Sequence, residues 1–439
     1  MPRGLVGGVI VATVVLLARQ AGASAFYIQE QSVAGTGRAY AGESAVADTP
    51  ATIFFNPAGL TYLERPEIMG AGYAILPNAS FENRGTTART FSTFGSFRPV
   101  HGNDGGNPYG PTPLGNFYAS MPVVPDRVWL GLGASAPYGL LVVYNSTWFG
   151  RYDSTKSWLE TFNFAPTVAV KATDWLSLGV SLNIERAYTQ LRNALPNPTT
   201  PGGPTASGDG RATVKGDSTA VGFTLGVLTQ PTSRSRIGVT WRWGISHDLE
   251  GTIDVTGLKG ILHVANMHQG GSAALDLPQT VMIGGLYDLS SRVRLLGQVN
   301  WFGWSSFQEI RVVPDKGPAI VDPQNFHDTV SLAGGVEWEV IDGLRLRTGF
   351  QYDETPTVDQ FRNTRIPDAD RYLLAAGASY RVTDSIEATL GYLHGFVKEA
   401  TFQRNRQFYP GTPLLTSYRF RADASAMVNV VGVGLTYRF

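Results

Sequence analysis

Short segments of strict period-two alternation recur along this chain. In the segment 175–184, apolar side chains alternate with Ser, Gly and Asn, and the segments 236–243 and 344–352 behave in the same way. Alternate residues of a β-strand point to opposite faces, so each segment predicts a strand with one apolar face. A soluble sandwich shows the same alternation, which leaves the fold class open at this point.

The connections between the candidate strands alternate in length. Fourteen strands can be counted, separated by six short turns and seven long loops. A barrel with both chain ends on one side of a membrane requires this arrangement, whereas a sandwich does not. The strands are centred on Gly70, Phe117, Leu130, Phe164, Leu178, Phe223, Val239, Ile283, Leu296, Gly334, Leu346, Leu374, Thr389 and Val433. The long loops fall at 78–113, 138–158, 193–212, 245–277, 304–327, 354–369 and 395–424.

Aromatic residues mark the ends of the apolar faces. In the segment 371–380 the apolar face begins at Tyr372 and ends at Tyr380. Eight residues of a tilted strand rise roughly 19 Å, close to the height of a lipid-facing band between aromatic girdles. The last alternating segment ends on Phe439 itself, which resembles the signal that the barrel assembly machinery reads. We therefore predict an all-β transmembrane barrel of about 14 antiparallel strands in the bacterial outer membrane.

The first 25 residues have the layout of a secretory signal peptide. Arg3 precedes an uncharged apolar run over residues 5–18, and Ala23, Ser24 and Ala25 form a small-residue cleavage site. A membrane-spanning helix needs about 20 apolar residues, more than this run provides. The sequence thus predicts a signal peptide over 1–25 and a mature chain that begins near Phe26.

Composition narrows the function classes. Lys and Arg together equal Asp and Glu, at 35 each, so no nucleic-acid partner is expected. The chain has no Cys, and its six His are scattered. Because neither metal ligands nor a grouped nucleophile and base are found, we predict no metal, no cofactor and no enzyme activity.

Residues 26–65 lack strand alternation and precede the barrel predicted over 66–439. Fourteen strands enclose a lumen that side chains alone do not fill. The segment is rich in Ala and Gly, which allow short helices and turns to pack closely. It also carries Phe26, Tyr27 and Phe54, which would be costly to expose as a periplasmic arm. We predict an N-terminal hatch, or plug, of short helices in the lumen.

Ten motifs in chain order resemble the FadL family, outer-membrane channels for long-chain fatty acids with aromatic-hydrocarbon relatives (the OMPP1/FadL/TodX type). The resemblance covers nearly the whole mature chain. The motifs are 29–32 (Gln-Glu-Gln-Ser), 35–42, 56–59 (Asn-Pro-Ala-Gly), 136–139 (Ala-Pro-Tyr-Gly), 148–152 (Trp-Phe-Gly-Arg-Tyr), 235–242, 277–280 (Leu-Pro-Gln-Thr), 301–307, 353–356 (Asp-Glu-Thr-Pro) and 366–371.

The resemblance implies a monomer that binds ligand first in an extracellular groove and then in a pocket beside the hatch. Release would be sideways, next to a kinked third strand. It assigns hatch or gate roles to Asn56, Pro57, Ala58, Glu30, Gly37 and Arg38, and the opening to Gly131, Gly133 and Pro137. Phe26, Tyr27 and Arg371 are candidate ligand contacts. Two simpler interpretations stay open: Asn56 and Pro57 form a plain turn, and the glycines only tolerate close neighbours.

Five arginines are expected to point into the lumen: Arg236, Arg242, Arg345, Arg347 and Arg371. They could meet a fatty-acid carboxylate or pair with hatch acids such as Glu30, Glu43 and Asp48. We favour the pairing, because a plug in a basic lumen needs counter-charges.

The resulting hypothesis is a passive channel that takes up hydrophobic compounds and releases them into outer-membrane lipid. The resemblance favours long-chain fatty acids, with aromatic hydrocarbons as the alternative. A second alternative is an adhesive or structural barrel, whose loop 78–113 would present Phe81, Phe91, Phe94 and Phe97 to a partner.

Overall fold

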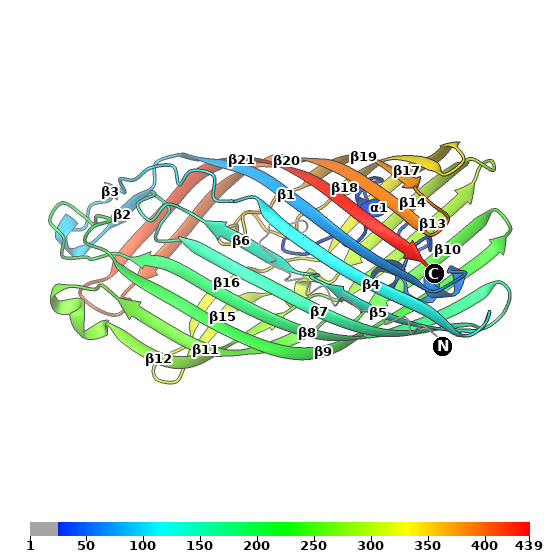
Figure 1. The fold of residues 1–439 in the computed structure, drawn as a ribbon. Coiled ribbons are helices and arrows are strands. Elements are labelled where there is room, and N and C mark those ends of the chain that lie inside the picture. The colour runs from blue at the N-terminus through cyan, green and yellow to red at the C-terminus, as the bar shows by residue number, and fades with distance from the viewer. Residues whose placement is uncertain (1–24) are drawn as a thin grey trace, which may run out of the picture.

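The computed structural model describes residues 25–439 as a closed barrel (Figure 1). All but the last residue of the predicted signal peptide lie outside this range. The final strand pairs with the first in antiparallel register, from Glu67 with Arg438 to Asn83 with Ala422. In Figure 1, the long hairpins gather at the left end and the C-terminus lies at the right end. Short turns of bacterial barrels face the periplasm, so the left end is extracellular.

Fourteen antiparallel strands form the wall within the described part of the chain, which confirms the predicted fold class. Each of the fourteen predicted centres lies in one of them. In ring order they are β1 (Glu67–Asn83), β4 (Thr112–Val124), β5 (Val128–Ser135), β7 (Lys156–Lys171), β8 (Leu176–Leu195), β9 (Gly210–Thr232), β10 (Ser235–Arg242), β13 (Thr280–Asp288), β14 (Val293–Phe302), β17 (Thr329–Ile341), β18 (Leu344–Asp353), β19 (Arg371–Arg381), β20 (Ile386–Phe408) and β21 (Thr416–Arg438).

The predicted loops were too long, because strand pairing continues beyond the membrane. The range 395–424 was expected to be irregular, yet β20 and β21 remain paired out to Phe408 with Thr416. Outward residues there are polar, such as Gln403 and Asn405. The apolar alternation therefore ends before the backbone pairing of the two strands does. The remaining elements are β2 (Thr87–Arg89), η2 (Phe91–Thr93), β3 (Arg98–Pro99), β6 (Gly139–Val143), β11 (Ser246–Thr256), η3 (Gly260–Ala265), β12 (Met267–Asp276), η4 (Trp304–Ser306), β15 (Glu309–Pro314) and β16 (Ile320–Pro323).

The outer face carries the predicted apolar band. On β19, Tyr372, Leu374 and Tyr380 are exposed, with 52% of Tyr380 accessible, while Leu373 and Ala375 point inward and are buried. This alternation suits a wall with lipid on one side and packed protein on the other. Among residues 25–439, no helix is both long and apolar enough to cross a bilayer.

The hatch fills the lumen with α1 (Val33–Thr36), α2 (Thr52–Phe55) and η1 (Pro57–Tyr62). Figure 1 shows α1 inside the barrel, behind β18. Its turns are locally specified: the Ser32 hydroxyl accepts a hydrogen bond from the Gly35 amide and caps α1. Pro57 occupies the first turn of η1, where its missing N–H is not needed.

Inward-facing glycines of the wall bring the hatch backbone into direct contact with the strands. A Cβ added to Gly238 would overlap the carbonyl group of Ser44, and one added to Gly349 would overlap the carbonyl of Arg38. At Gly377, an added Cβ would lie 2.8 Å from the Cα of Gly37. Even a methyl group at these positions would move the hatch away from the wall.

Replacing Gly238 with Ala should therefore displace the hatch while leaving the barrel inserted. Overpacking at such a site costs roughly 1–3 kcal/mol. The expected result is faster passage of small sugars into vesicles that contain the variant, measured by swelling. Gly285 is the matched control, because it pairs beside Gly238 on β13 and has open space where its Cβ would be. Equal passage through both variants would show that the hatch does not depend on this contact.

Candidate functional site

The wall is interrupted after β5. β5 and β4 stay in register up to Ala134 with Phe117, and β6 then pairs with β7 alone. Residues 112–116 of β4 therefore face β6 without registered pairing. Pro137 lies in the interruption, where its missing N–H removes a ladder bond.

Gly131 and Gly133 lie outside this interruption. Both are paired to β4 and to β7, so neither weakens the ladder. Their missing side chains instead make room for the hatch: a Cβ on Gly131 would lie 2.7 Å from Cδ1 of Ile53, and one on Gly133 would lie 3.0 Å from Cγ2 of the same residue. The positions of Gly131 and Gly133 therefore fit the simpler interpretation, in which these glycines only tolerate close neighbours.

The N-terminal residues of the hatch, 26–31, occupy the interruption and are called the gate segment below. The amide of Ile28 donates to the Pro137 carbonyl at 2.8 Å, and the Gly139 amide donates to the Phe26 carbonyl at 2.7 Å. On the other side, the Asn116 side chain of β4 donates to the carbonyl of Glu30 at 3.0 Å. The gate segment thus supplies hydrogen bonds that a continuous strand would otherwise provide.

Phe26 projects into an apolar pocket with a volume of about 70 Å³ on the extracellular side of the hatch. Its aliphatic lining comes from β6, β7, β8, β9, β11, β12 and β15. Among the residues that the structure describes, Arg365 is the one charged residue in the lining. The main apolar contributors are Leu159, Leu191, Leu249, Leu275, Phe307 and Ile310.

The Arg365 guanidinium is buried, with 5% of the residue exposed, and only partly neutralised. Its Nη2 donates to the Asn193 side chain at 3.0 Å, and Nε lies 3.6 Å from the Asp322 carboxylate. Asp322 also binds Arg404, and Nη1 of Arg365 has no hydrogen-bond partner within the described chain. Burial and the neighbouring Arg406 lower the pKa of Arg365 to about 10.

Arg365 and two neighbouring arginines share two carboxylates. Arg404 and Arg406 both approach Asp153, at 3.4 and 3.5 Å. Together with Asp322, this gives two carboxylates for three guanidinium groups. The excess charge sits at the upper wall of an otherwise apolar pocket. Neither Arg365 nor this cluster was singled out from the sequence, because residue 365 looked like an ordinary loop position.

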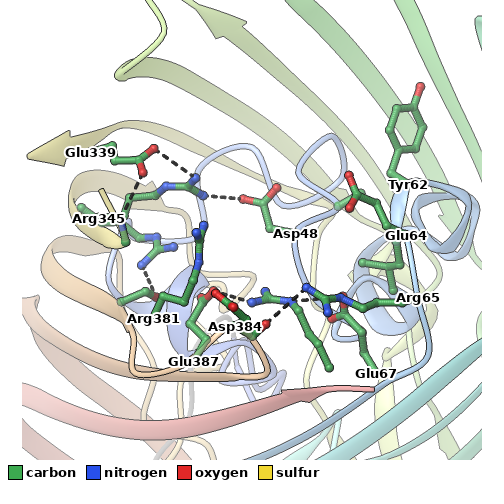
Figure 2. A pocket seen from close by; sticks show the side chains of 16 residues that line it. Asp48, Tyr62, Glu64, Arg65, Glu67, Glu339, Arg345, Arg381, Asp384 and Glu387 are labelled. Atoms are coloured by element: carbon green, nitrogen blue, oxygen red, sulfur yellow. Dashed lines mark hydrogen bonds and ion pairs between the residues drawn. The ribbon is translucent and has the colours of Figure 1, made fainter. Parts of the chain in front are cut away.

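At the periplasmic end, Asp48 anchors the hatch to the wall. Its carboxylate lies 3.0 Å from Arg294 on β14, 3.2 Å from Arg345 on β18 and 3.9 Å from Arg236 on β10. Figure 2 shows Asp48 joined to Arg345 in the lining of a polar pocket of about 460 Å³. Burial raises the pKa of Asp48, but the three guanidinium groups outweigh burial and hold it well below its usual range.

A second anchor is Arg38 of the hatch, which binds Glu43 at 2.8 Å and Glu337 of β17 at 2.6 Å. Arg347 binds the same Glu337 carboxylate at 2.8 Å. Gly37, beside Arg38, provides the backbone contact with Gly377 described above. The residues 37 and 38 therefore fix one side of the hatch by both shape and charge.

Of the five lumen arginines, two pair with a hatch acid, as the favoured interpretation expected, and the other three pair with acids of the wall. Arg236 and Arg345 meet the hatch acid Asp48. Arg242 lies 3.8 Å from Glu185 of β8, and Arg371 lies 3.1 Å from Asp353. Arg371 does not line the apolar pocket, and neither does Tyr27, which packs against Tyr138 at a ring-centroid distance of 5.5 Å.

Asn56 joins the hatch to β9. Its side-chain amide donates to the carbonyls of Ser44 at 2.7 Å and Val227 at 3.0 Å, and its oxygen accepts from the amide of Ala58 at 3.1 Å. Pro57 follows at the start of η1, packed over Gly226. One side chain therefore caps η1 and bonds the wall.

Replacing Asp48 with Asn should loosen the hatch at its periplasmic side. The change keeps the shape but leaves three guanidinium groups without their shared counter-charge, at a cost of about 2 kcal/mol. Protease cleavage within residues 40–65 of the folded protein should then appear at lower urea concentration. The control is Asp288→Asn, which breaks a single, more exposed ion pair with Arg294. It should change the urea concentration of cleavage only a little. An unchanged hatch in Asp48→Asn would contradict the anchoring role.

Glu30 should make the gate segment sensitive to pH. Burial raises the pKa of its carboxyl to about 7, against the opposing influence of Arg371 and Tyr40. Between the ordinary pKa of a Glu side chain and pH 7, Glu30 holds a proton when the gate segment is closed and lacks it when the segment is open to solvent. The stability of the closed segment therefore falls as pH rises through this range. Hydrogen exchange of amides 26–31, corrected for intrinsic rates, should be faster at pH 8 than at pH 5.5. Glu30→Gln should remove the difference, and a persistent difference would assign the effect to another group.

The family comparison covers nearly the whole chain. Residues 14–439 match the family described as outer membrane protein transport protein (OMPP1/FadL/TodX). The 47 kDa outer membrane protein of Pasteurella multocida (strain Pm70) is 27% identical, over 97% of this chain and 96% of its own. The long-chain fatty acid transport protein of Escherichia coli (strain K12) is 25% identical, over 87% of this chain and 90% of its own.

Solved structures agree with this assignment. A Pseudomonas aeruginosa FadL homologue superposes with a TM-score of 0.85 at 25% identity, covering 94% of this chain and 99% of that chain. The Ralstonia pickettii toluene transporter TbuX gives 0.63 at 18% identity, with 93% and 98% covered, and shows the fold alone. The described chain therefore belongs to the OMPP1/FadL/TodX family of outer-membrane transporters of hydrophobic compounds.

Proposed function

We propose that this protein is a passive outer-membrane channel for long-chain fatty acids, which occupy the apolar pocket beside the hatch and leave sideways into the membrane. The observation that carries the proposal is the pairing of an aliphatic pocket with the incompletely neutralised guanidinium of Arg365. A fatty acid offers a matching pair of features, an alkyl chain and one carboxylate.

The two parts of the pocket contribute in different ways. Each CH₂ that leaves water for the leucine-lined space gains about 0.8 kcal/mol. A carboxylate that accepts a hydrogen bond from the free Nη1 of Arg365 would gain roughly 1.5–3 kcal/mol. The volume of about 70 Å³ is that of a closed state, so Phe26 and the leucine side chains must move aside to admit a long chain.

The charge at Arg365 distinguishes fatty acids from the aromatic-hydrocarbon alternative. Toluene has no group that can bond Nη1, so the buried donor would stay unsatisfied when such a ligand is bound. The similarity to the toluene transporter concerns the fold and does not outweigh this argument. We therefore favour an anionic amphiphile.

The anchors of the hatch support sideways release. Asp48 and Arg38 bind it to four strands of the wall, so leaving the lumen would break all of these ion pairs at once. Moving the gate segment breaks a few hydrogen bonds at the interruption beside β5. Because an alkyl chain that passes there reaches lipid without crossing water, no energy source or chemical step is needed.

The adhesive alternative would use a different surface. Phe91 and Phe94 are exposed at an extracellular tip, with 94% of Phe94 accessible, whereas Phe81 is buried against Tyr144 and Trp148. A role in adhesion would depend on these two exposed side chains and not on the pocket. Variants of the pocket therefore separate the two functions.

Replacing Arg365 with Leu should weaken oleate binding about tenfold, equivalent to about 1.4 kcal/mol, while toluene uptake stays the same. Uptake of both labelled compounds is measured in cells that lack their own channel. Arg365→Lys should restore part of the oleate uptake, and Arg311→Leu, an exposed position paired with Glu309, is the control. Equal loss of both substrates would show that Arg365 is structural.

A second variant tests the pocket itself. Leu249→Trp should fill the space between β8 and β12 and reduce uptake of any pocket ligand, with normal insertion confirmed by heat-modifiable migration. Uptake unaffected by this change would rule out the pocket as the route. Lost cell attachment in Phe94→Ser, with intact uptake, would instead point to adhesion.

A further inference from the structure

A groove of about 470 Å³ lies on the outer side of the wall, at the extracellular ends of β8, β9 and β11. Arg192 and Arg211 line it. On β8, Arg192 continues the series of lipid-facing side chains that includes Leu182 and Ile184, without a break in register. On β9, Arg211 continues the outward series of Val221 in the same way. Both arginines therefore point away from the lumen, and the wall separates them from the apolar pocket.

The two arginines are neighbours on this outer face. Arg192 pairs with Thr213 and Arg211 pairs with Ala194, so the arginines occupy diagonal positions on adjacent strands. Diagonal neighbours lie about 7–8 Å apart, within reach of long side chains. Two guanidinium groups at this separation repel each other unless a negative charge lies between them.

The protein itself supplies little counter-charge here. Among residues 25–439, neither guanidinium group forms an ion pair with a carboxylate, and Nε of Arg192 donates to the Thr155 hydroxyl at 3.3 Å. Asp209 is the one acid of the lining, but it binds Arg151 at 2.8 Å and only 3% of its side chain is exposed. Asp254, an outward residue of β11, is bonded to a histidine of β12 at 2.6 Å. The groove is thus ready to take an anion.

The rest of the lining is neutral and can form hydrogen bonds. Ser146, Thr147, Thr155 and Thr256 contribute hydroxyl groups, each of which can donate and accept. Guanidinium groups bind phosphate and carboxylate through charge-assisted hydrogen bonds. The volume lies in the range of sites for small molecules. Arginines and hydroxyl groups around one groove match a sugar that carries an acidic group.

The height of the groove narrows the source of this sugar. Ile184 is the last large apolar side chain exposed on β8, and Arg192 follows eight residues later. On a strand tilted by about 45° these residues are separated by roughly 19 Å along the membrane normal. The head-group layer of a phospholipid leaflet is only about 5–8 Å thick, so phospholipid phosphates do not reach the groove. Lipopolysaccharide of the outer leaflet has a longer head, because its core sugars carry phosphate and carboxylate groups well above the membrane surface.

We propose that this groove binds the phosphorylated core oligosaccharide of lipopolysaccharide, with a phosphate held between Arg192 and Arg211. The phosphate would end the repulsion between the two guanidinium groups and accept hydrogen bonds from both. The attached sugars would lie against the hydroxyl groups of the lining. The site is outside the lumen, so it adds a lipid partner that is independent of the proposed passage of fatty acids.

Equilibrium binding to the purified, folded protein in detergent tests the site. The probes are lipopolysaccharide with a phosphorylated core and lipid A, which has the acyl chains and glucosamine phosphates but no core sugars. The variant is Arg192→Gln/Arg211→Gln. The matched control is Arg186→Gln, since Arg186 lies on the same outward face of β8, nearer to the membrane, and is paired with Asp217 at 2.8 Å. Heat-modifiable migration confirms that each barrel is folded.

The double variant should bind lipopolysaccharide about tenfold more weakly and lipid A as before, while Arg186→Gln stays within about twofold of the unchanged protein. Unchanged binding of lipopolysaccharide by the double variant would overturn the site. An equal loss in Arg186→Gln, or an equal loss of lipid A binding, would also overturn it, because the effect would then be one of general charge or of the lipid anchor. Full displacement of lipopolysaccharide by millimolar inorganic phosphate would assign the arginines to the free ion and reject the lipid. Oleate uptake should be normal in the double variant, so failure of this site and failure of the proposed function are separate results.

Discussion

Hydrogen bonding of the wall is the constraint on which the rest of the structure depends. A strand in lipid has no water to satisfy its amides and carbonyls, so a barrel may be interrupted only where protein supplies the missing partners. At the interruption beside β5, the gate segment does so through the Phe26 carbonyl and the Ile28 amide.

The electrostatic arrangement divides the lumen into two levels. Near the periplasm, five guanidinium groups meet five carboxylates, and these ion pairs hold the hatch. The arginines are Arg38, Arg236, Arg294, Arg345 and Arg347, and the acids are Glu43, Asp48, Asp288, Glu337 and Glu339. Near the outside, Arg365, Arg404 and Arg406 share only Asp153 and Asp322. The proposal that an anionic ligand binds at the outer cluster rests on this difference.

The sequence predicted the barrel well because lipid imposes a simple rule on every second residue. On β19, the side chains from Tyr372 to Tyr380 alternate between lipid and the lumen, and the sequence shows this alternation directly. The same pattern gave the positions of all fourteen strands. Beyond the membrane the rule ends, so β20 and β21 were expected to stop too early. Phe81 looked like a loop residue and is part of a buried aromatic group.

The candidate site was less accessible to prediction, because it depends on which residues meet across the lumen. The alternation predicted that Arg236 and Arg345 point into the lumen, and both side chains do meet Asp48 there. Arg294 lies just after a short turn, and Arg365 lies in an irregular loop, so periodicity marked neither. The roles assigned by resemblance to Asn56, Pro57 and Arg371 stay predictions, although the contacts of Asn56 suit a latch.

The ion pairs between the hatch and the wall have a consequence for the order of folding. The hatch is synthesised before the barrel, yet Arg38 finds Glu337, 299 residues later in the chain, and Asp48 finds Arg345. These contacts of high sequence separation cannot form until β14, β17 and β18 are in place. Docking of the hatch therefore follows the formation of these strands. A periplasmic intermediate would keep its hatch carboxylates solvated until the wall has assembled around them.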